Sequence, residues 1–479
     1  MVRSLIFAVI LLLTGCVVGP AYRPPKTTAP AHWRSNPVGP SSGAALRSFW
    51  MEFKDPTLAQ LIRQAVANNY DLKIAGERIR AADDMVRIAA AGSLPQVGIG
   101  AAVESRRETQ TLDWPPTDSK YGDYPYYALG FDASWELDLF GGIRRQKESA
   151  QAGADAAVET RRGILVSLTA AVASTYLSLR ATGLRVQIAR ANLGVARRTQ
   201  RLAHHGFEAG ERSHLDVSEA DGRVHTIEAS IPPLEAQLDE LTDALAILLA
   251  QVPESFGSDG LHIHAAMPDP PPLPPSLPSE VIAQRPDIRR AEREYAQASA
   301  NVGVAVAALY PNFSIPLDIS STSSLIHEMF RHASLLWRMG LDGTQSLYSG
   351  GGLTANVDAA RADQEAALFN YQQTVLRAFG EVEDALSRQR AEELRYQALT
   401  AGVADDRRAV LEAQERYQRG QENLLPALEA QQLLYATDDA LVVSSLSRCL
   451  VDISLFKALG GNWENVALPK VAASRRATS

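Results

Sequence analysis

Cysteine is almost absent from this sequence. The 479 residues include two, Cys16 and Cys449, and no CxxC pair or other paired zinc-ligand spacing occurs. A disulfide framework is therefore excluded. The nine histidines are scattered, without three potential ligands at a recognisable zinc spacing. We expect neither a metal site nor a cofactor.

Aromatic residues are also scarce, at 7%, although 46% of the residues are hydrophobic. Alanine and leucine supply much of that fraction, which favours long packed helices over a β-sandwich. The net charge is −8 and no long basic block occurs, so nucleic acid is not an expected partner. No nucleophile elbow, P-loop, HExxH or paired-carboxylate motif is present. We therefore expect that the protein is not an enzyme.

No apolar run near the N-terminus reaches the ~20 residues that a membrane-spanning helix needs. The longest near the N-terminus is Leu5–Leu13, which follows Arg3 and precedes Leu13-Thr14-Gly15-Cys16. This order resembles the lipobox of bacterial lipoproteins, in which the cysteine is acylated and becomes the first mature residue. Val17 follows, where an aspartate would favour retention in the inner membrane. The alternative is an ordinary signal peptide with a chance cysteine.

The chain repeats itself. The segment from Asn69, "NYDLKIAGERIRAADD", aligns without a gap with the segment from Arg285, "RPDIRRAEREYAQASA". A second pair of segments has identical residues at four positions: Gly210 and Gly420, Leu215 and Leu425, Glu219 and Glu429, Ala220 and Ala430. The Pro-rich joint 267–280 separates the two copies and is typical of a stiff, extended linker.

Four segments alternate between apolar and polar residues, as strands with two different faces do: about 95–105, 128–140, 311–321 and 334–346. In the second, Phe131 and Trp135 share one face, and Asp132 and Glu136 share the other. Each run has about the ~10 residues of a tilted transmembrane strand. The alternative is the half-buried strands of a soluble sheet.

Four strands cannot close a barrel, because small barrels need about eight. Open strand edges in lipid leave backbone groups unpaired, at a cost of several kcal/mol each. The barrel must therefore be completed by other copies of the chain. Two copies would give a nearly filled barrel, whereas three would give twelve strands and begin to leave a lumen.

Long helical patterns follow each pair of strands, at about 143–204, 213–250, 353–418 and 422–459. The first corresponds to a helix of about 90 Å, far longer than globular helices usually are. The paired helices should reverse at Gly210 and Gly420, because glycine readily adopts the left-handed conformation that ends a helix. Pro232-Pro233 should kink the second helix. A short loop there is the alternative.

Several motifs together resemble one family, and each stands in this sequence as follows: Cys16 with Val18-Gly19-Pro20-Ala21-Tyr22-Arg23-Pro24, "WELDLFGGIRR" from Trp135, "IPPLEAQL" from Ile231, "RPDIRRAE" from Arg285, and "ERYQRGQENLLPALEAQ" from Glu415 with "LFKALGGNW" after it. The chain is similar to bacterial outer membrane factors, in particular the TolC-like, NodT-type efflux lipoproteins. The likeness covers essentially the whole mature chain.

The resemblance implies a membrane α+β fold. In this family, three chains form a homotrimer with a twelve-stranded β-barrel in the outer membrane and an α-helical tunnel across the periplasm. The barrel contacts outer membrane lipid. A periplasmic adaptor (membrane fusion) protein and an inner-membrane pump of the RND type engage the tunnel tip, which closes at rest. Export through the duct is passive, because the pump supplies the energy.

The resulting order of segments has six parts: a lipoprotein signal peptide (1–15), an N-terminal extended segment wrapping the tunnel (16–50), repeat 1 (51–266), the Pro-rich linker (267–280), repeat 2 (281–462) and a C-terminal tail (463–479). The covalent lipid on Cys16, a palmitate-type acyl anchor, is the only added group that we expect.

Site residues follow from the resemblance, by motif. Leu425 and Glu429, one turn apart, match the ring of residues that forms the periplasmic gate. The tip turns, which would contact the adaptor, contain Gly210, Leu215, Gly420 and Leu424. The alternative is that Leu425 packs between helices and Glu429 faces solvent.

The sequence departs from the family pattern in two places. Pro426 stands where threonine or aspartate is usual, which leaves the tip geometry open. Tyr348-Ser349-Gly350-Gly351 replaces an aromatic-Asp-Gly-Gly at a junction between strand and helix.

Two other functions stay open. One is the outer membrane channel of a type I secretion system, which exports proteins. The other is a lipid-anchored periplasmic coiled-coil adaptor, for which the amphipathic strand pairs would have no use. The exported substrates, and the identity of the adaptor and pump, cannot be read from the sequence.

Overall fold

The computed structural model describes residues 17–34, 49–107, 123–256, 266–271, 278–461 and 463. The predicted signal peptide and the acylation of Cys16 lie outside these residues, as does most of the predicted C-terminal tail. The chain divides into two compact units. Unit 1 comprises residues 1–26, 78–157 and 290–371, and unit 2 comprises residues 27–77, 158–289 and 372–479.

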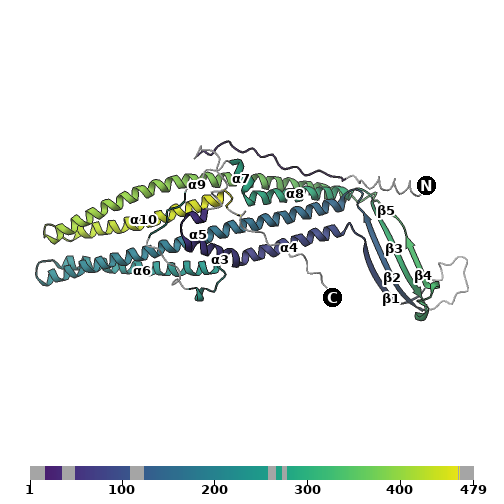
Figure 1. The fold of residues 1–479 in the computed structure, drawn as a ribbon, viewed down its shortest axis with the longest axis horizontal. Coiled ribbons are helices and arrows are strands. Elements are labelled where there is room, and N and C mark those ends of the chain that lie inside the picture. The colour runs from purple at the N-terminus through teal and green to yellow at the C-terminus, as the bar shows by residue number, and fades with distance from the viewer. Residues whose placement is uncertain are drawn as a thin grey trace. The chain divides into compact units, whose positions relative to one another are not determined.

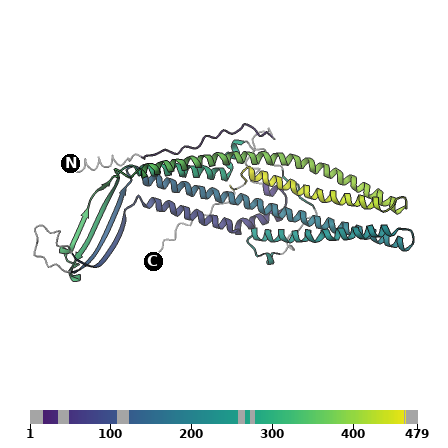
Figure 2. The ribbon, with the colours of Figure 1, turned by 180° about the vertical axis from the view of Figure 1, so that it is seen from behind.

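Unit 1 contains an antiparallel sheet in the order β1-β2-β3-β4 (Figure 1). Figure 2 shows the same sheet from behind. Its strands are β1 (Gln96–Arg106), β2 (Tyr124–Leu137), β3 (Asn312–Ser323), β4 (Leu335–Met339) and β5 (Asp342–Thr344), which pairs with β3. Two helices lead into the sheet: α4 (Tyr70–Ala91) precedes β1, and α8 (Pro286–Ala307) precedes β3.

The strand expected at about 334–346 is divided into β4 and β5, which is a correction to the sequence-based prediction. Pro316 on β3 lies opposite the break, and its ring nitrogen has no hydrogen to donate. The backbone N–H of Gly340 still donates to the Pro316 carbonyl, at 3.3 Å. One ladder bond, the one that residue 316 would donate, is therefore missing at this position, which interrupts the strand.

The N-terminal segment of unit 1 packs tightly against the strand-to-helix junction. The backbone N–H of Val18 donates to the Phe140 carbonyl at 3.1 Å. Gly19 approaches Gly303 so closely that a Cβ on Gly19 would lie 2.6 Å from the Gly303 Cα. Gly19 also has φ +85, in the left-handed region that favours glycine. A side chain at Gly19 would therefore separate the segment from α8.

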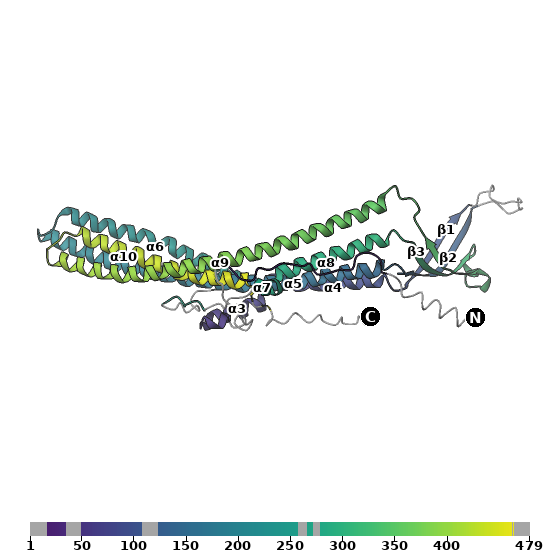
Figure 3. The same ribbon diagram turned by 90° about the horizontal axis from the view of Figure 1, so that it is seen from above.

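Unit 2 contains most of two long helical hairpins, which reverse at the same end (Figure 3). The first is α5 (Gly142–Glu208) with α6 (His214–Leu248), and the second is α9 (Gly352–Gln418) with α10 (Leu425–Ala458). An apolar cluster joins α5 to α6: Ala189, Leu193, Ala196, Val224, Ile227 and Ile231. One stretch of α5 is long and apolar enough to cross a membrane, but 67% of it is buried within the protein, as in a core helix.

Helix α6 continues through Pro232 and Pro233, so the short loop weighed as an alternative at this place is wrong. Both proline side chains are exposed. The carbonyl groups that lose their N–H partners to the prolines therefore lie on the solvent side of the helix, where water can replace the missing donors.

A buried ion pair anchors helix α3 (Pro56–Asn68) in unit 2. Asp55 Oδ1 accepts from the backbone N–H groups of Thr57 and Leu58, at 3.0 and 3.1 Å, and so caps the helix. The other carboxylate oxygen accepts from Arg180 at 2.5 Å and from the Tyr176 hydroxyl at 3.0 Å. The side chains of Asp55 and Arg180 are 3% and 4% exposed. The pKa of Tyr176 is raised to about 12, first because of burial and then because of the Asp55 charge.

Two arginine side chains contact Trp463, which lies beyond the end of α10. Gly460 and Gly461 both have positive φ, at 103° and 67°, and end the helix. The guanidinium carbons of Arg162 and Arg289 lie 4.0 and 5.1 Å from the centre of the indole ring. The indole N–H donates to the Gln284 carbonyl at 3.0 Å. These cation–π contacts stabilise the position of the Trp463 side chain against the helices.

Candidate gate at the hairpin tips

The two tip turns, at Gly210 and Gly420, have the same backbone geometry. Their φ values are 76° and 69°, and each glycine N–H donates back to a residue three positions earlier, Phe207 or Tyr417. The next N–H donates five positions back, at 2.8 Å in the first turn and 3.0 Å in the second. This pair of bonds is the Schellman motif, which requires a left-handed residue at the glycine position.

The helices that follow the turns begin differently. Helix α6 begins with a capping box, in which Ser213 and Asp216 exchange hydrogen bonds at 3.2 and 3.0 Å. Helix α10 begins at Leu425, three residues later than expected, and its N-cap Leu424 offers no side-chain bond. Pro426 lies in the first turn of α10, where a missing N–H costs nothing. Pro426 is therefore compatible with the tip geometry.

The predicted gate residues lie on one exposed face of α10. Leu425 is 45% exposed, and Glu429, one turn later, is also exposed. In a single chain, then, Leu425 does not pack fully between helices. An exposed leucine above an exposed carboxylate gives this face an apolar and an anionic group at a defined spacing.

Leu424, which was predicted to belong to an adaptor-contacting turn, has a side chain that is fully buried in the single chain. It belongs to an apolar cluster that joins the two hairpins near the tip: Ala203, Val217, Ala220, Tyr417, Leu424, Ala427 and Leu428. Leu215, by contrast, is 65% exposed beside the first turn. Leu424 therefore supports the tip from inside, while Leu215 remains accessible.

Arg212 connects the first turn to the second hairpin. Its guanidinium carbon lies 4.3 Å from the centre of the Tyr417 ring, and its Nη2 donates to the Tyr417 carbonyl at 3.2 Å. Burial raises the pKa of Tyr417, whose hydroxyl is buried without a hydrogen-bond partner among the described residues. This contact holds the two hairpins together. The alignment of the two repeats did not single out Arg212.

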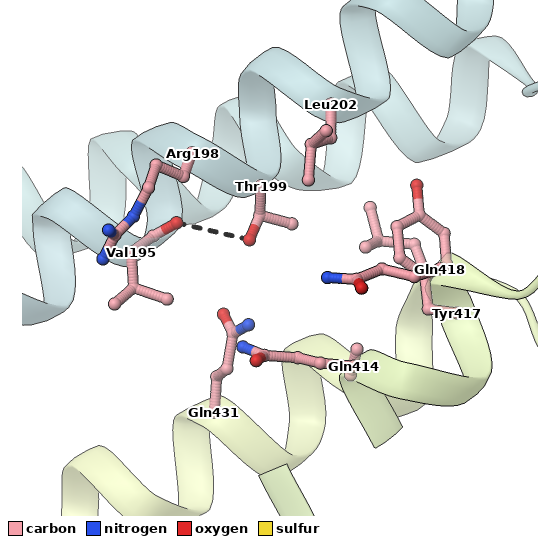
Figure 4. Close-up of a pocket in the computed structure, with 10 residues that line it drawn as sticks. Val195, Arg198, Thr199, Leu202, Gln414, Tyr417, Gln418 and Gln431 are labelled. Carbon is pink, nitrogen blue, oxygen red and sulfur yellow. Dashed lines mark hydrogen bonds between the residues drawn. The ribbon is translucent and has the colours of Figure 1, made fainter. Parts of the chain in front are cut away.

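A cavity of about 240 Å³ lies between the hairpins, next to the apolar cluster (Figure 4). The amides of Gln414, Gln418 and Gln431 and the hydroxyl of Thr199 point toward it. Gln431 is only 5% exposed. Next to the apolar cluster around Leu424, a polar gap therefore interrupts the close packing between the hairpins. Sequence reasoning missed this cavity, because widely separated glutamines give no periodic signal.

A polar seam joins α9 to α10 farther from the tip. Gln389 donates to Asp452 at 2.6 Å, Ser444 donates to Glu392 at 2.6 Å, and Arg448 pairs with Glu393 at 2.9 Å. Asp452 is 5% exposed. Burial raises its pKa to about 6, against the opposing effect of the Gln389 hydrogen bond.

Within the described ranges, no three His, Cys, Asp or Glu side chains lie close enough together to hold a metal ion. Cys449 is the free cysteine of this part of the chain. Burial raises the pKa of its thiol to about 12, which makes it unreactive.

Comparison with known proteins gives a consistent result. The family model described as outer membrane efflux protein matches residues 61–251 and 277–461. The pyoverdine export outer membrane protein OpmQ of Pseudomonas aeruginosa is 31% identical over 468 residues, which cover 95% of this chain and 96% of that protein. Nodulation protein T of Rhizobium leguminosarum bv. viciae is 32% identical over 483 residues, which cover 98% and 95%.

A solved structure of the outer-membrane channel OprN matches in three dimensions as well. Its TM-score is 0.86 at 33% identity, and the match covers 94% of this chain and 100% of that one. The shared architecture is mostly helical with a sheet. The chain belongs to the outer membrane efflux protein family.

Proposed function

We propose that three copies of this chain form the outer membrane channel of a tripartite efflux system, a passive duct from the periplasm to the exterior. The observation that carries the proposal is that the sheet has open edges. Its strands follow in the order β1-β2-β3-β4, and each end strand, β1 or β4, pairs with one strand in the described part of the chain. One face of this sheet exposes large apolar side chains: Val97, Ile99, Phe131, Trp337 and Met339. A sheet with an apolar outer face and open edges is complete only when further copies close it.

The helices support the same assembly. Large apolar side chains stay exposed along two helices. They are Ile74, Met85 and Ile88 on α4, and Phe369, Leu376, Leu394 and Leu411 on α9. Apolar stripes of this kind on a monomer are typical of surfaces that other chains cover. A trimer would place them between neighbouring copies.

The position of Val17 supports the proposed lipid anchor on Cys16. Val17 packs against Gly141, whose φ is +80 and whose Cβ, if present, would lie 3.0 Å from the Val17 Cα. Gly141 lies between β2 and α5. Acyl chains on Cys16 would therefore start near the helix-side end of the strands, where the barrel meets the membrane surface.

We expect the lipid to be a secondary anchor, since the strands would span the membrane by themselves. Cys16→Ser should block processing at this site. The same variant, exported by a different signal peptide, should still form trimers. Failure to trimerise would show that acylation is needed for assembly.

The gate would consist of Leu425 and Glu429 from each copy. A ring of leucines excludes water, and a ring of carboxylates attracts cations and repels anions. Adaptor engagement at Leu215 and the two turns would separate the hairpins and widen this ring. The Arg212–Tyr417 contact and the buried cluster around Leu424 would oppose that movement.

Single-channel conductance in planar bilayers tests the gate. Leu425→Ser combined with Glu429→Ser should raise the resting conductance, because both the apolar seal and the charge ring are lost. Leu325→Ser is the matched control, since Leu325 is also an exposed leucine but lies in the connection between β3 and β4. Equal conductance in the double variant and the control would remove these two residues from the gate.

Two alternatives remain distinct from this proposal. A type I secretion channel would export proteins, so a deletion strain would lose a secreted protein instead of becoming susceptible to small toxic compounds. A periplasmic adaptor would fractionate with the inner membrane and would not form detergent-resistant trimers. OpmQ is named for pyoverdine export, and we propose likewise a small molecule as the cargo here. We also propose that the chain has no catalytic activity of its own.

A further inference from the structure

The polar face of the sheet carries a row of three charged side chains beside a glycine. The register places Gly98 opposite Asp132, Asp132 opposite Asp318, and Asp318 opposite Arg338. Four residues on four successive strands therefore lie side by side across the sheet. All four belong to unit 1. We call this row the charge belt: Gly98, Asp132, Asp318 and Arg338.

The neighbouring row shows which way the charge belt faces. The next residues on the same strands pair in the same order and are all large and apolar: Ile99, Phe131, Ile319 and Trp337. Their side chains are 67%, 58%, 42% and 74% exposed in the single chain. Successive side chains of a strand point to opposite faces. If the apolar row contacts lipid, the charge belt lines the lumen of the barrel.

The charges of the belt are only partly compensated. Arg338 Nε lies 3.2 Å from Asp318 Oδ2. Asp132 has no basic partner in the described part of the chain. A Cβ at position 98 would lie 2.8 Å from Asp132 Oδ1, so the glycine leaves the space that this carboxylate occupies over β1. Like charges directly opposite on neighbouring strands destabilise a sheet, so sheet stability does not account for the pair of aspartates.

We propose that the charge belt is a charge filter of the barrel, which favours cationic over anionic solutes during export. This inference rests on the proposed function, because the polar face lines a lumen only in a closed barrel. Two carboxylates and one guanidinium leave one net negative charge per chain, and a three-chain barrel repeats that charge three times around one level. A ring of fixed charge inside a narrow, low-dielectric wall raises the local concentration of the opposite ion.

Reporter cysteines on each side of the belt can measure this local potential. Ser314 and Ser320 lie on the same face of β3 as Asp318, one toward α8 and the other toward the β3–β4 loop. Each is changed to cysteine in turn. The purified trimer, in an uncharged detergent at low salt, then reacts with a cationic methanethiosulfonate, the trimethylammonium ethyl reagent, and with an anionic one, the sulfonatoethyl reagent. The parent protein supplies the background rate, which should be low because Cys449 is fully buried.

The measured quantity is the ratio of the cationic to the anionic reaction rate at each reporter. One unit charge about 8 Å away in water changes the local concentration of a singly charged reagent about twofold, and hence this ratio about fourfold. Asp132→Asn combined with Asp318→Asn should therefore lower the ratio at both reporters by about fourfold or more, and added salt should shrink the effect. Asp84→Asn, which removes an exposed carboxylate from α4, should leave the ratio unchanged.

The outcomes separate the filter from the barrel. If both reporters react and their ratios are the same with and without the two aspartates, the charge filter is refuted while the barrel stands. If the variants do not form trimers, the single change Asp132→Asn, which breaks no ion pair, gives the same test with about half the effect on a logarithmic scale. If trimers form but neither reporter reacts, the polar face does not line a lumen, and the proposed function fails together with the filter.

Discussion

The buried carboxyl of Asp452 predicts a pH-dependent stability of the seam between α9 and α10. Its pKa is about 6 in the folded chain, against an ordinary value of 3.8, and burial is the main cause. Between about pH 4 and 6 the folded chain thus holds a proton that the unfolded chain has lost. Stability falls as the pH rises through this window and is constant above it.

The size of the effect follows from the two pKa values. Their difference corresponds to about 3 kcal/mol per chain, since one pKa step is worth 1.36 kcal/mol. Asp452→Asn removes the titration and keeps an oxygen that can accept the hydrogen bond from Gln389. The variant should therefore gain about 3 kcal/mol relative to the natural chain when the pH rises from 4 to 7.

Native-state hydrogen exchange of the α10 amides measures this difference directly, because it reports the free energy of local opening. The opening free energy is determined for both proteins at several pH values from 4 to 8, with intrinsic exchange rates corrected for pH. Asp405→Asn is the control, since Asp405 is an exposed carboxylate on α9 that pairs with Arg408. Parallel curves for the Asp452 variant and the natural chain would show that Asp452 does not titrate in this window, and the reasoning from burial would fail.

Three further predictions concern contacts within one unit each. Asp55→Ala should lower the opening free energy of α3 by roughly 3–5 kcal/mol in hydrogen exchange, because it leaves Arg180 buried without its carboxylate; an unchanged α3 would contradict the anchoring role. Trp463→Ala should make the C-terminal segment sensitive to protease by removing both cation–π contacts, without affecting trimer yield. Gly303→Ala should speed proteolysis near Gly19, because the new Cβ would lie 2.8 Å from an arginine side chain that bonds the N-terminal segment; cleavage at the natural rate would rule this out.

Much of the architecture follows from two periodic signals. The alternation around Phe131 and Asp132 predicted a strand, because period-2 patterning is the geometry of a pleated backbone. The long unbroken pattern that ends near Gly210 predicted a helix, and the structure has α5 there. Both signals depend on the local sequence alone, so they can be interpreted without knowledge of the tertiary contacts. The overall fold class, mostly helical with a sheet, was accordingly predictable.

The features that sequence missed depend on particular neighbours in space. The break between β4 and β5 arises from Pro316 on another strand, which no inspection of residues 334–346 reveals. Arg285 opens the quoted motif "RPDIRRAE", but its function in the fold is to donate to the Ala458 carbonyl at 2.9 Å and to pair with Glu381 at 2.7 Å. A motif indicates that a residue matters and leaves open which distant group it binds.

The tip shows how far a repeat can guide the assignment of a site. The two halves match at Gly210 and Gly420 because both turns need the same left-handed residue. The match also pairs Leu215 with Leu425, and both leucines are exposed. Leu424 has no such constraint from the repeat, and it is buried, since α10 begins one residue after it and turns its side chain inward. The repeat therefore predicts the backbone geometry of the two turns and the exposure of this pair of leucines. The side chains that hold the hairpins together, such as Arg212 and Tyr417, are set by contacts between the two halves. These contacts differ between the halves, because each hairpin packs against the other and not against a copy of itself.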